Sequence, residues 1–187
     1  MRKILALAGL AFVVLMAGCV RSVHPIYTKE DLTFDPGLLG TWLEKNDKDI
    51  WTIERAGDKA YKLTCLEDGE ETKSATFDAR LVRVGEQQFL DLFPEGPQFK
   101  SEFYKFHLLP VHSFVRVSLQ GDSGRMTVLN NDWLSKKIAA RELDLPHFVV
   151  DEDLVLTGGT KELRDFLIRI AEEKNAYYAP SEFQRRK

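Results

Sequence analysis

The sequence predicts a mainly β protein, an antiparallel barrel of about eight strands with a short internal helix and an amphipathic C-terminal helix. Two observations lead to this prediction. From residue 38 onward, apolar side chains alternate with polar ones, which is the period of a strand with one buried face. Turn-forming residues recur about every ten residues, so few long connections are possible.

The strands are defined by short alternating runs between turns. In the fourth run the apolar positions change face after Leu81, which predicts a β-bulge there. Residues 148–150 and 154–156 are expected to form a last strand, or a tight hairpin across an acidic turn. The seven runs before them are 38–44, 49–55, 60–66, 74–84 (the fourth run), 88–93, 113–120 and 125–130.

Two segments between these runs have a different character. Residues 99–109 are rich in aromatic side chains and fit either a strand or a short helical turn. Asn131-Asp132 is a typical helix cap, and it predicts a helix over residues 133–142 that Pro146 prevents from continuing.

The C-terminal helix is predicted over residues 161–174. Its apolar positions form one stripe, so it requires a sheet or barrel wall to cover. Pro180 is expected to end the ordered part, and Arg185-Arg186-Lys187 is expected to be frayed and solvated. The stripe consists of Leu163, Phe166, Leu167, Ile170 and Ala171.

The N-terminus carries a targeting motif. The apolar run Ile4–Ala17 has fourteen residues, fewer than the ~20 that a membrane-spanning helix needs. It ends in Leu15-Met16-Ala17-Gly18-Cys19, which resembles the lipobox of bacterial lipoproteins. The alternative is an N-terminal membrane helix that is never cleaved.

The lipobox resemblance implies where the protein is located. Residues 1–18 would be a cleaved signal peptide, and Cys19 would carry the lipid, such as palmitate, that anchors the chain in the membrane. In a host with two membranes we expect the outer membrane, facing the periplasm, because Val20 and Arg21 stand where inner-membrane retention signals usually show Asp.

Residues 19–37 are interpreted as the lipidated tether and lead-in turn, and 38–187 as a single domain. The lead-in carries Ile26, Tyr27 and Phe34, which are costly to leave in water, so it is expected to lie against the domain. Within it, Thr28–Asp31 fits a capping box that opens one helical turn.

The opening of the first strand carries a second resemblance. Phe34-Asp35-Pro36-Gly37-Leu38-Leu39-Gly40-Thr41-Trp42-Leu43-Glu44 is similar to the opening motif of the lipocalins, in which a helical turn precedes Gly-x-Trp. The resemblance implies that Gly40 and Trp42 are that pair and that Trp42 plugs the closed end of a barrel. The family also has a later Arg that covers this Trp, and the sequence does not assign it. The chain also resembles β-rich bacterial lipoproteins with a C-terminal helix.

Charge and composition exclude some functions. Without Arg2 and Lys3 the 26 basic residues become 24 against 29 acidic ones, a net charge of −5, which argues against nucleic acid as a partner. Cys65 lies on an apolar strand face and is interpreted as a buried hydrophobe. His107 and His112 are five residues apart without a nearby acidic ligand, so neither a metal nor a cofactor is expected.

No catalytic constellation is evident, so an enzyme is the least favoured class. Trp51, Tyr61 and Phe77 lie on the apolar faces of three successive strands, where they would line a hollow barrel or fill a solid one. Arg116 could meet a ligand's acidic group from inside the barrel, or face water outside. The leading hypothesis is a lipid-anchored envelope protein that binds a small amphiphile, and the alternative is a protein-protein interaction module with a filled core.

Overall fold

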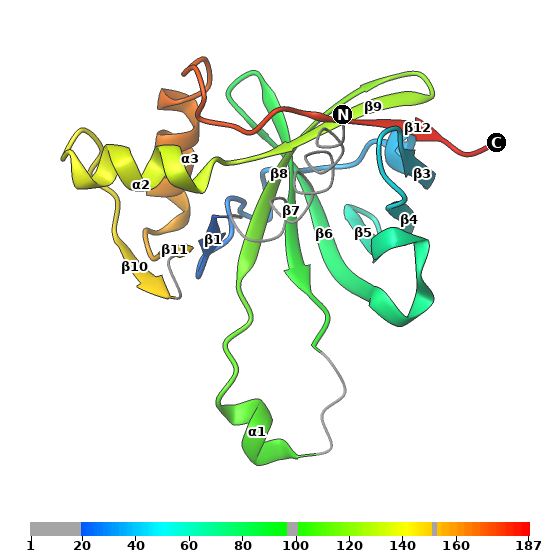
Figure 1. The fold of residues 1–187 in the computed structure, drawn as a ribbon, viewed down its shortest axis with the longest axis horizontal. Coiled ribbons are helices and arrows are strands. Elements are labelled where there is room, and N and C mark those ends of the chain that lie inside the picture. Colours follow the sequence, from blue (N-terminus) through cyan, green and yellow to red (C-terminus); the bar gives the residue numbers. More distant parts are fainter. Residues whose placement is uncertain (1–19, 97–100, 151–152) are drawn as a thin grey trace, which may run out of the picture.

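The computed structural model describes residues 20–96, 101–150 and 153–187. The predicted signal peptide and Cys19 lie outside these ranges. Within them, eight antiparallel strands close into a barrel, which confirms the predicted fold class (Figure 1). The order around the barrel is β8–β7–β6–β5–β4–β3–β12–β9 and back to β8. The strands are β3 (Gly40–Glu44), β4 (Ile50–Gly57), β5 (Ala60–Leu66), β6 (Ser74–Val84), β7 (Gln87–Pro94), β8 (His112–Gln120), β9 (Ser123–Val128) and β12 (Ser181–Arg185).

The eighth strand of the barrel is not the one expected from the sequence. β12 lies beyond Pro180 and pairs with β3 on one side and β9 on the other, so it closes the barrel. The prediction that order ends at Pro180 is therefore wrong, as is the frayed terminus at Arg185. The sequence does not predict this strand, because Ser181–Arg185 has one large apolar residue, Phe183, which is too few to show an alternating pattern.

The predicted bulge near Leu81 is also wrong. β6 and β7 pair without a break from Phe77↔Pro94 to Val84↔Gln87. Leu81 faces the barrel interior, whereas Val82 and Val84 belong to a second apolar cluster on the outside. The apparent change of face arises because this end of β6 is buried on both sides.

A small sheet extends the barrel wall beyond β8. β1 (Arg21–Ser22) pairs with the start of β8 and runs parallel to β11 (Asp153–Leu156), which in turn pairs with β10 (His147–Val150). Residues 148–150 and 154–156 are thus the hairpin of the two alternatives, and it lies outside the barrel. The strand β2 (Leu32–Thr33) pairs with β6.

Two helices cover the outer wall beside this sheet (Figure 1). The helix α3 (Thr160–Arg169) begins one residue before the predicted start and ends five residues before the predicted end. Its stripe of Leu163, Phe166 and Leu167 is buried against the outer cluster. The helix α2 (Asn131–Ala139) begins two residues earlier than predicted because Asn130, not Asn131, caps it. Within the described residues, no helix is long and apolar enough to cross a membrane.

The lead-in segment is an integral part of the fold. Val20 is 3% exposed and Ile26 is fully buried. The lead-in ends in the 3₁₀ helix η1 (Pro36–Leu38), and two further 3₁₀ helices, η2 (Glu67–Gly69) and η3 (Glu71–Lys73), connect β5 to β6. Thr28 and Asp31 form a hydrogen-bonded turn and not the helical turn expected. The described chain is therefore packed on the domain from its first residue, Val20.

Candidate functional site

Much of the barrel interior is occupied by its own side chains, and Trp51, Cys65 and Phe77 pack on this part while staying partly exposed. Each of the thirteen buried members of the interior cluster is at most 5% exposed. A water-sized cavity beside these side chains would leave accessible surface on them, so the interior around them is a packed core. The members are Leu38, Trp42, Ile53, Tyr61, Leu63, Ala79, Leu81, Leu90, Leu92, Val115, Val117, Met126 and Phe183.

Trp42 lies at one end of this core and is fully buried. Its indole nitrogen donates to the carbonyl of Leu38 in η1, at 2.8 Å. Arg185 of β12 covers the ring from outside, with its guanidinium carbon 4.4 Å from the ring centroid. Gly40 has a φ of +125°, a backbone conformation that favours glycine, and a Cβ there would lie 2.9 Å from the end of the Arg185 side chain.

The three aromatic residues predicted to line a pocket belong to this core. Tyr61 is fully buried, and its hydroxyl accepts from the backbone nitrogen of Asp35 at 2.6 Å, which fixes the lead-in. Trp51 and Phe77 are half-buried and pack on the interior cluster. The indole nitrogen of Trp51 is buried and has no hydrogen-bond partner. The fold thus brings the three together as packing residues.

Arg116 lies on the outside of the barrel. It occupies the face of β8 opposite to Val115 and Val117, both of which belong to the interior cluster. Its guanidinium stacks on the ring of Tyr177 at 4.0 Å from the centroid. Arg116 therefore does not point into the barrel, and of the two predicted alternatives the outer position is correct.

A buried Asp–His pair on the outer wall was not predicted. Asp91 of β7 is wholly buried, accepts from the backbone nitrogen of Ile26 at 2.9 Å, and lies 2.6 Å from Nδ1 of His112. A recess of about 270 Å³ adjoins it, lined also by Tyr27 and Phe93. The sequence signal for this pair was Asp91, an aspartate within the almost continuously apolar run 88–93. The pair fastens the lead-in segment to the barrel, because it binds the Ile26 amide.

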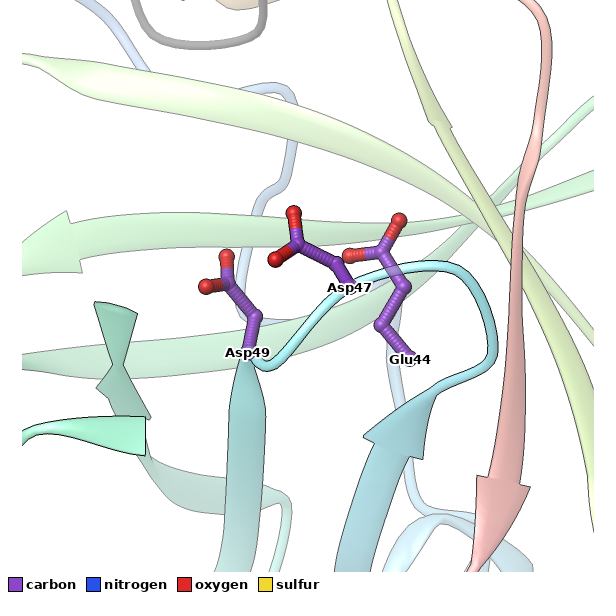
Figure 2. Close-up of side chains that lie close together, drawn as sticks. All are labelled: Glu44, Asp47 and Asp49. Atoms are coloured by element: carbon purple, nitrogen blue, oxygen red, sulfur yellow. The ribbon is translucent and has the colours of Figure 1, made fainter. Parts of the chain in front are cut away.

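Three carboxylates gather at the turn between β3 and β4 (Figure 2). One oxygen each from Glu44, Asp47 and Asp49 lie within 4.8 Å of one another, the spacing of metal ligands. Burial, and then the neighbouring charges, raise the pKa of Glu44 and of Asp49. All three side chains are half-buried, and Oδ2 of Asp47 has no hydrogen-bond partner. A partly exposed acidic cluster does not by itself make a metal site, so we assign no ion to it.

The three most exposed large apolar side chains of the described residues, Phe106, Phe103 and Leu109, lie in a projection between β7 and β8. We call residues 101–110 the apolar projection; all ten are exposed, and Figure 1 shows its helix α1 (Glu102–Phe106) far from the body of the protein. Of the two readings of this segment, the helical turn is correct for the described residues. Its large apolar side chains are Phe103, Tyr104, Phe106, Leu108 and Leu109.

The projection is ordered by contacts within itself. Ser101 caps α1 by accepting from the backbone nitrogen of Tyr104, and Nδ1 of His107 lies 2.7 Å from the carbonyl of Phe103. The rings of Phe103 and Phe106 lie 4.7 and 5.5 Å from the His107 ring. Because burying a side chain such as Phe or Leu gains about 1.5–3 kcal/mol, this surface is costly to leave in water.

The described residues thus define a closed antiparallel barrel with a filled core and an apolar projection on its outside. Comparisons with models of protein families, with curated proteins and with solved structures found no match to this chain.

Proposed function

We propose that the protein is a lipid-anchored envelope protein that acts as an interaction module, with the apolar projection docking into a groove of a partner protein. The observation behind this proposal is the combination of a packed barrel with ten consecutive exposed residues that carry five large apolar side chains. Exposed apolar surface of this kind marks interaction sites.

The form of the projection favours a protein partner. Its aromatic rings are already fixed by the Ser101 cap and by contacts with His107, so little conformational entropy is lost on binding. A few well-placed aromatic anchors supply most of the affinity of protein interfaces. A short helix that inserts apolar side chains into a groove is a recurring mode of recognition.

Anchoring at Cys19 is supported by the sequence motif and fits the early burial of the chain. Val20 is in the core, so acyl chains on Cys19 would hold the barrel wall close to the membrane. The lipocalin-like interpretation is supported by the Gly40–Trp42 pair and by Arg185, whose guanidinium lies over the Trp42 ring. A carrier that holds an amphiphile inside the barrel is less favoured, because the interior is packed.

The experiment is in-cell photo-crosslinking from a benzoylphenylalanine at position 106. We expect one discrete protein adduct in the membrane fraction, and none from the same probe at Asp58, in the exposed β4–β5 turn. Cys19→Ser should abolish lipidation and reduce the adduct. Crosslinks to lipid alone would contradict a protein partner. A fatty-acid adduct of the purified protein in native mass spectrometry would restore the carrier.

A further inference from the structure

A recess of about 490 Å³ opens where β8 separates from β7. The pairing of these strands ends at Gln88↔Val117, whereas β8 continues to Gln120 paired with β9. The β6–β7 turn and the β8–β9 hairpin therefore diverge, and the recess lies between them. It is distinct from the apolar projection, and none of its lining residues belongs to that projection.

Three arginines from three different strands line the recess: Arg83 of β6, Arg116 of β8 and Arg125 of β9. Glu86 is the acidic residue among the lining side chains. The whole chain has a net charge of −3, so this concentration of positive charge is local. A recess lined by one sign of charge concentrates ligands of the opposite sign.

Few ion pairs neutralise the charges of these arginines in the folded protein. Within the described part of the chain, the guanidinium groups of Arg83 and Arg116 have no carboxylate partner. Arg125 reaches Glu182 at 3.6 Å, with its side chain 66% exposed. An anion entering the recess would therefore not have to break a strong ion pair.

Arg116 is held ready for a ligand. Its guanidinium rests on the ring of Tyr177, whose hydroxyl is buried, and burial raises the pKa of Tyr177 to about 12. The ring is therefore neutral, and the stacking fixes the plane of the guanidinium without using its N–H donors. A planar guanidinium binds phosphate or carboxylate oxygens in pairs.

We propose that this recess binds an oxyanion of the phosphate class, with Arg116 as its main contact and Arg83 and Arg125 on either side. Val117 and Leu119 also line the recess, so an apolar group attached to the anion would find a matching wall. The phosphate could belong to an anionic lipid headgroup or be free in solution. Arg116 thus remains a candidate ligand residue, on the outside of the barrel.

The test is isothermal titration calorimetry of the full chain in a neutral detergent. The probes are inorganic phosphate and dihexanoyl phosphatidic acid, at low and high salt. We expect binding that weakens with salt and falls about tenfold or more in Arg116→Gln, with a smaller loss in Arg125→Gln. Arg169→Gln, an exposed arginine of α3, controls for charge and for uptake of lipid by the micelle.

The two arms separate the sources of the anion. Phosphatidic acid binding at least about tenfold tighter than phosphate would identify a lipid headgroup, and equal affinities would identify free phosphate. The inference is overturned if neither probe binds at millimolar concentration. It is also overturned if both bind Arg116→Gln and Arg125→Gln as tightly as the unaltered chain, because the heat would then come from elsewhere.

Discussion

The guanidinium of Arg185 lies over the ring of Trp42, 4.4 Å from its centroid, and joins the last strand of the chain to the first strand of the barrel. The same side chain donates to the carbonyls of Gly37 and Leu39 on the lead-in to that strand. Arg185 therefore connects three segments of the chain: η1, β3 and β12.

Replacing Arg185 should measure this connection. Arg185→Met keeps much of the apolar stem but removes the cation–π contact, worth about 0.5–2 kcal/mol, and the donors to Gly37 and Leu39. We expect a loss of about 1–3 kcal/mol in the free energy of unfolding, measured by urea denaturation. Arg186→Met, on the exposed neighbour, should change it by less than about 0.5 kcal/mol. Equal effects of the two would refute the role of Arg185.

Deleting residues 181–187 should prevent cooperative folding. Without β12, the edges of β3 and β9 are left unpaired and the buried ring of Phe183 is lost from the core. Loss of a buried Phe side chain alone costs about 3–5 kcal/mol, much of a domain's stability. Near-ultraviolet circular dichroism and urea titration would report the loss, and deletion of Lys187 alone is the control. A truncated chain with an unchanged transition would show that the barrel does not need β12.

His112→Ala should destabilise the fold, because it leaves the buried Asp91 carboxylate with fewer donors. The expected loss is about 1.5–3 kcal/mol, the range for a hydrogen bond to a charged group. His107→Ala, in the exposed projection, should cost less than about 0.5 kcal/mol. In the Asp91→Asn background the effect of His112→Ala should shrink. If the two losses simply add, the residues are not coupled.

Cys65 should be inert in the native protein. Burial, and then the charges of Asp49, Glu67 and Glu44, raise the pKa of its thiol from 9.0 to about 12. A thiol reacts as its thiolate, so this rise lowers the reactive fraction about a thousandfold at neutral pH. In the Cys19→Ser chain, iodoacetamide at pH 7.5 should leave the folded protein unmodified and alkylate one cysteine in guanidinium chloride. Rapid alkylation of the folded protein would contradict this.

The carboxylates at the β3–β4 turn should weaken the fold as the pH rises. The pKa values of Glu44 and Asp49 are raised above their ordinary values of 4.5 and 3.8, so the folded state holds these protons more tightly than the unfolded state. Stability from this source is present at low pH and is lost as the pH rises from about 4 through the raised values.

Asp47→Asn tests this relation, because the charge of Asp47 raises the pKa of both neighbours. The variant should be more stable than the unaltered chain near pH 7, by a few tenths of a kcal/mol since the groups are partly solvated, and the advantage should shrink near pH 4. Asp58→Asn, in an exposed turn, should show no such pH dependence. A stability gain that persists unchanged at pH 4 would refute the electrostatic explanation.

The sequence by itself determined most of the barrel strands and the buried face of the helix α3. Alternation and the turns between the runs located seven of the eight barrel strands, because most of these strands bury one face more than the other, although parts of β6 and β7 are buried on both faces. The stripe on α3 located the helix for the corresponding reason, with a period of 3.6. Gly40 and Trp42 marked the start of the first barrel strand, β3, because both lie in one short stretch of the chain.

The tertiary structure alone decided what closes the barrel and what its surface offers. β12 has a single buried apolar residue and is held by hydrogen bonds to β3 and β9, which come from distant parts of the chain. The face of Val82 depended on helices packed outside, and the position of Arg116 on the ring of Tyr177. The core contains Trp42, Tyr61 and Phe183, which come from three separate strands. Packing of this kind depends on how the strands curve together, which no local pattern specifies.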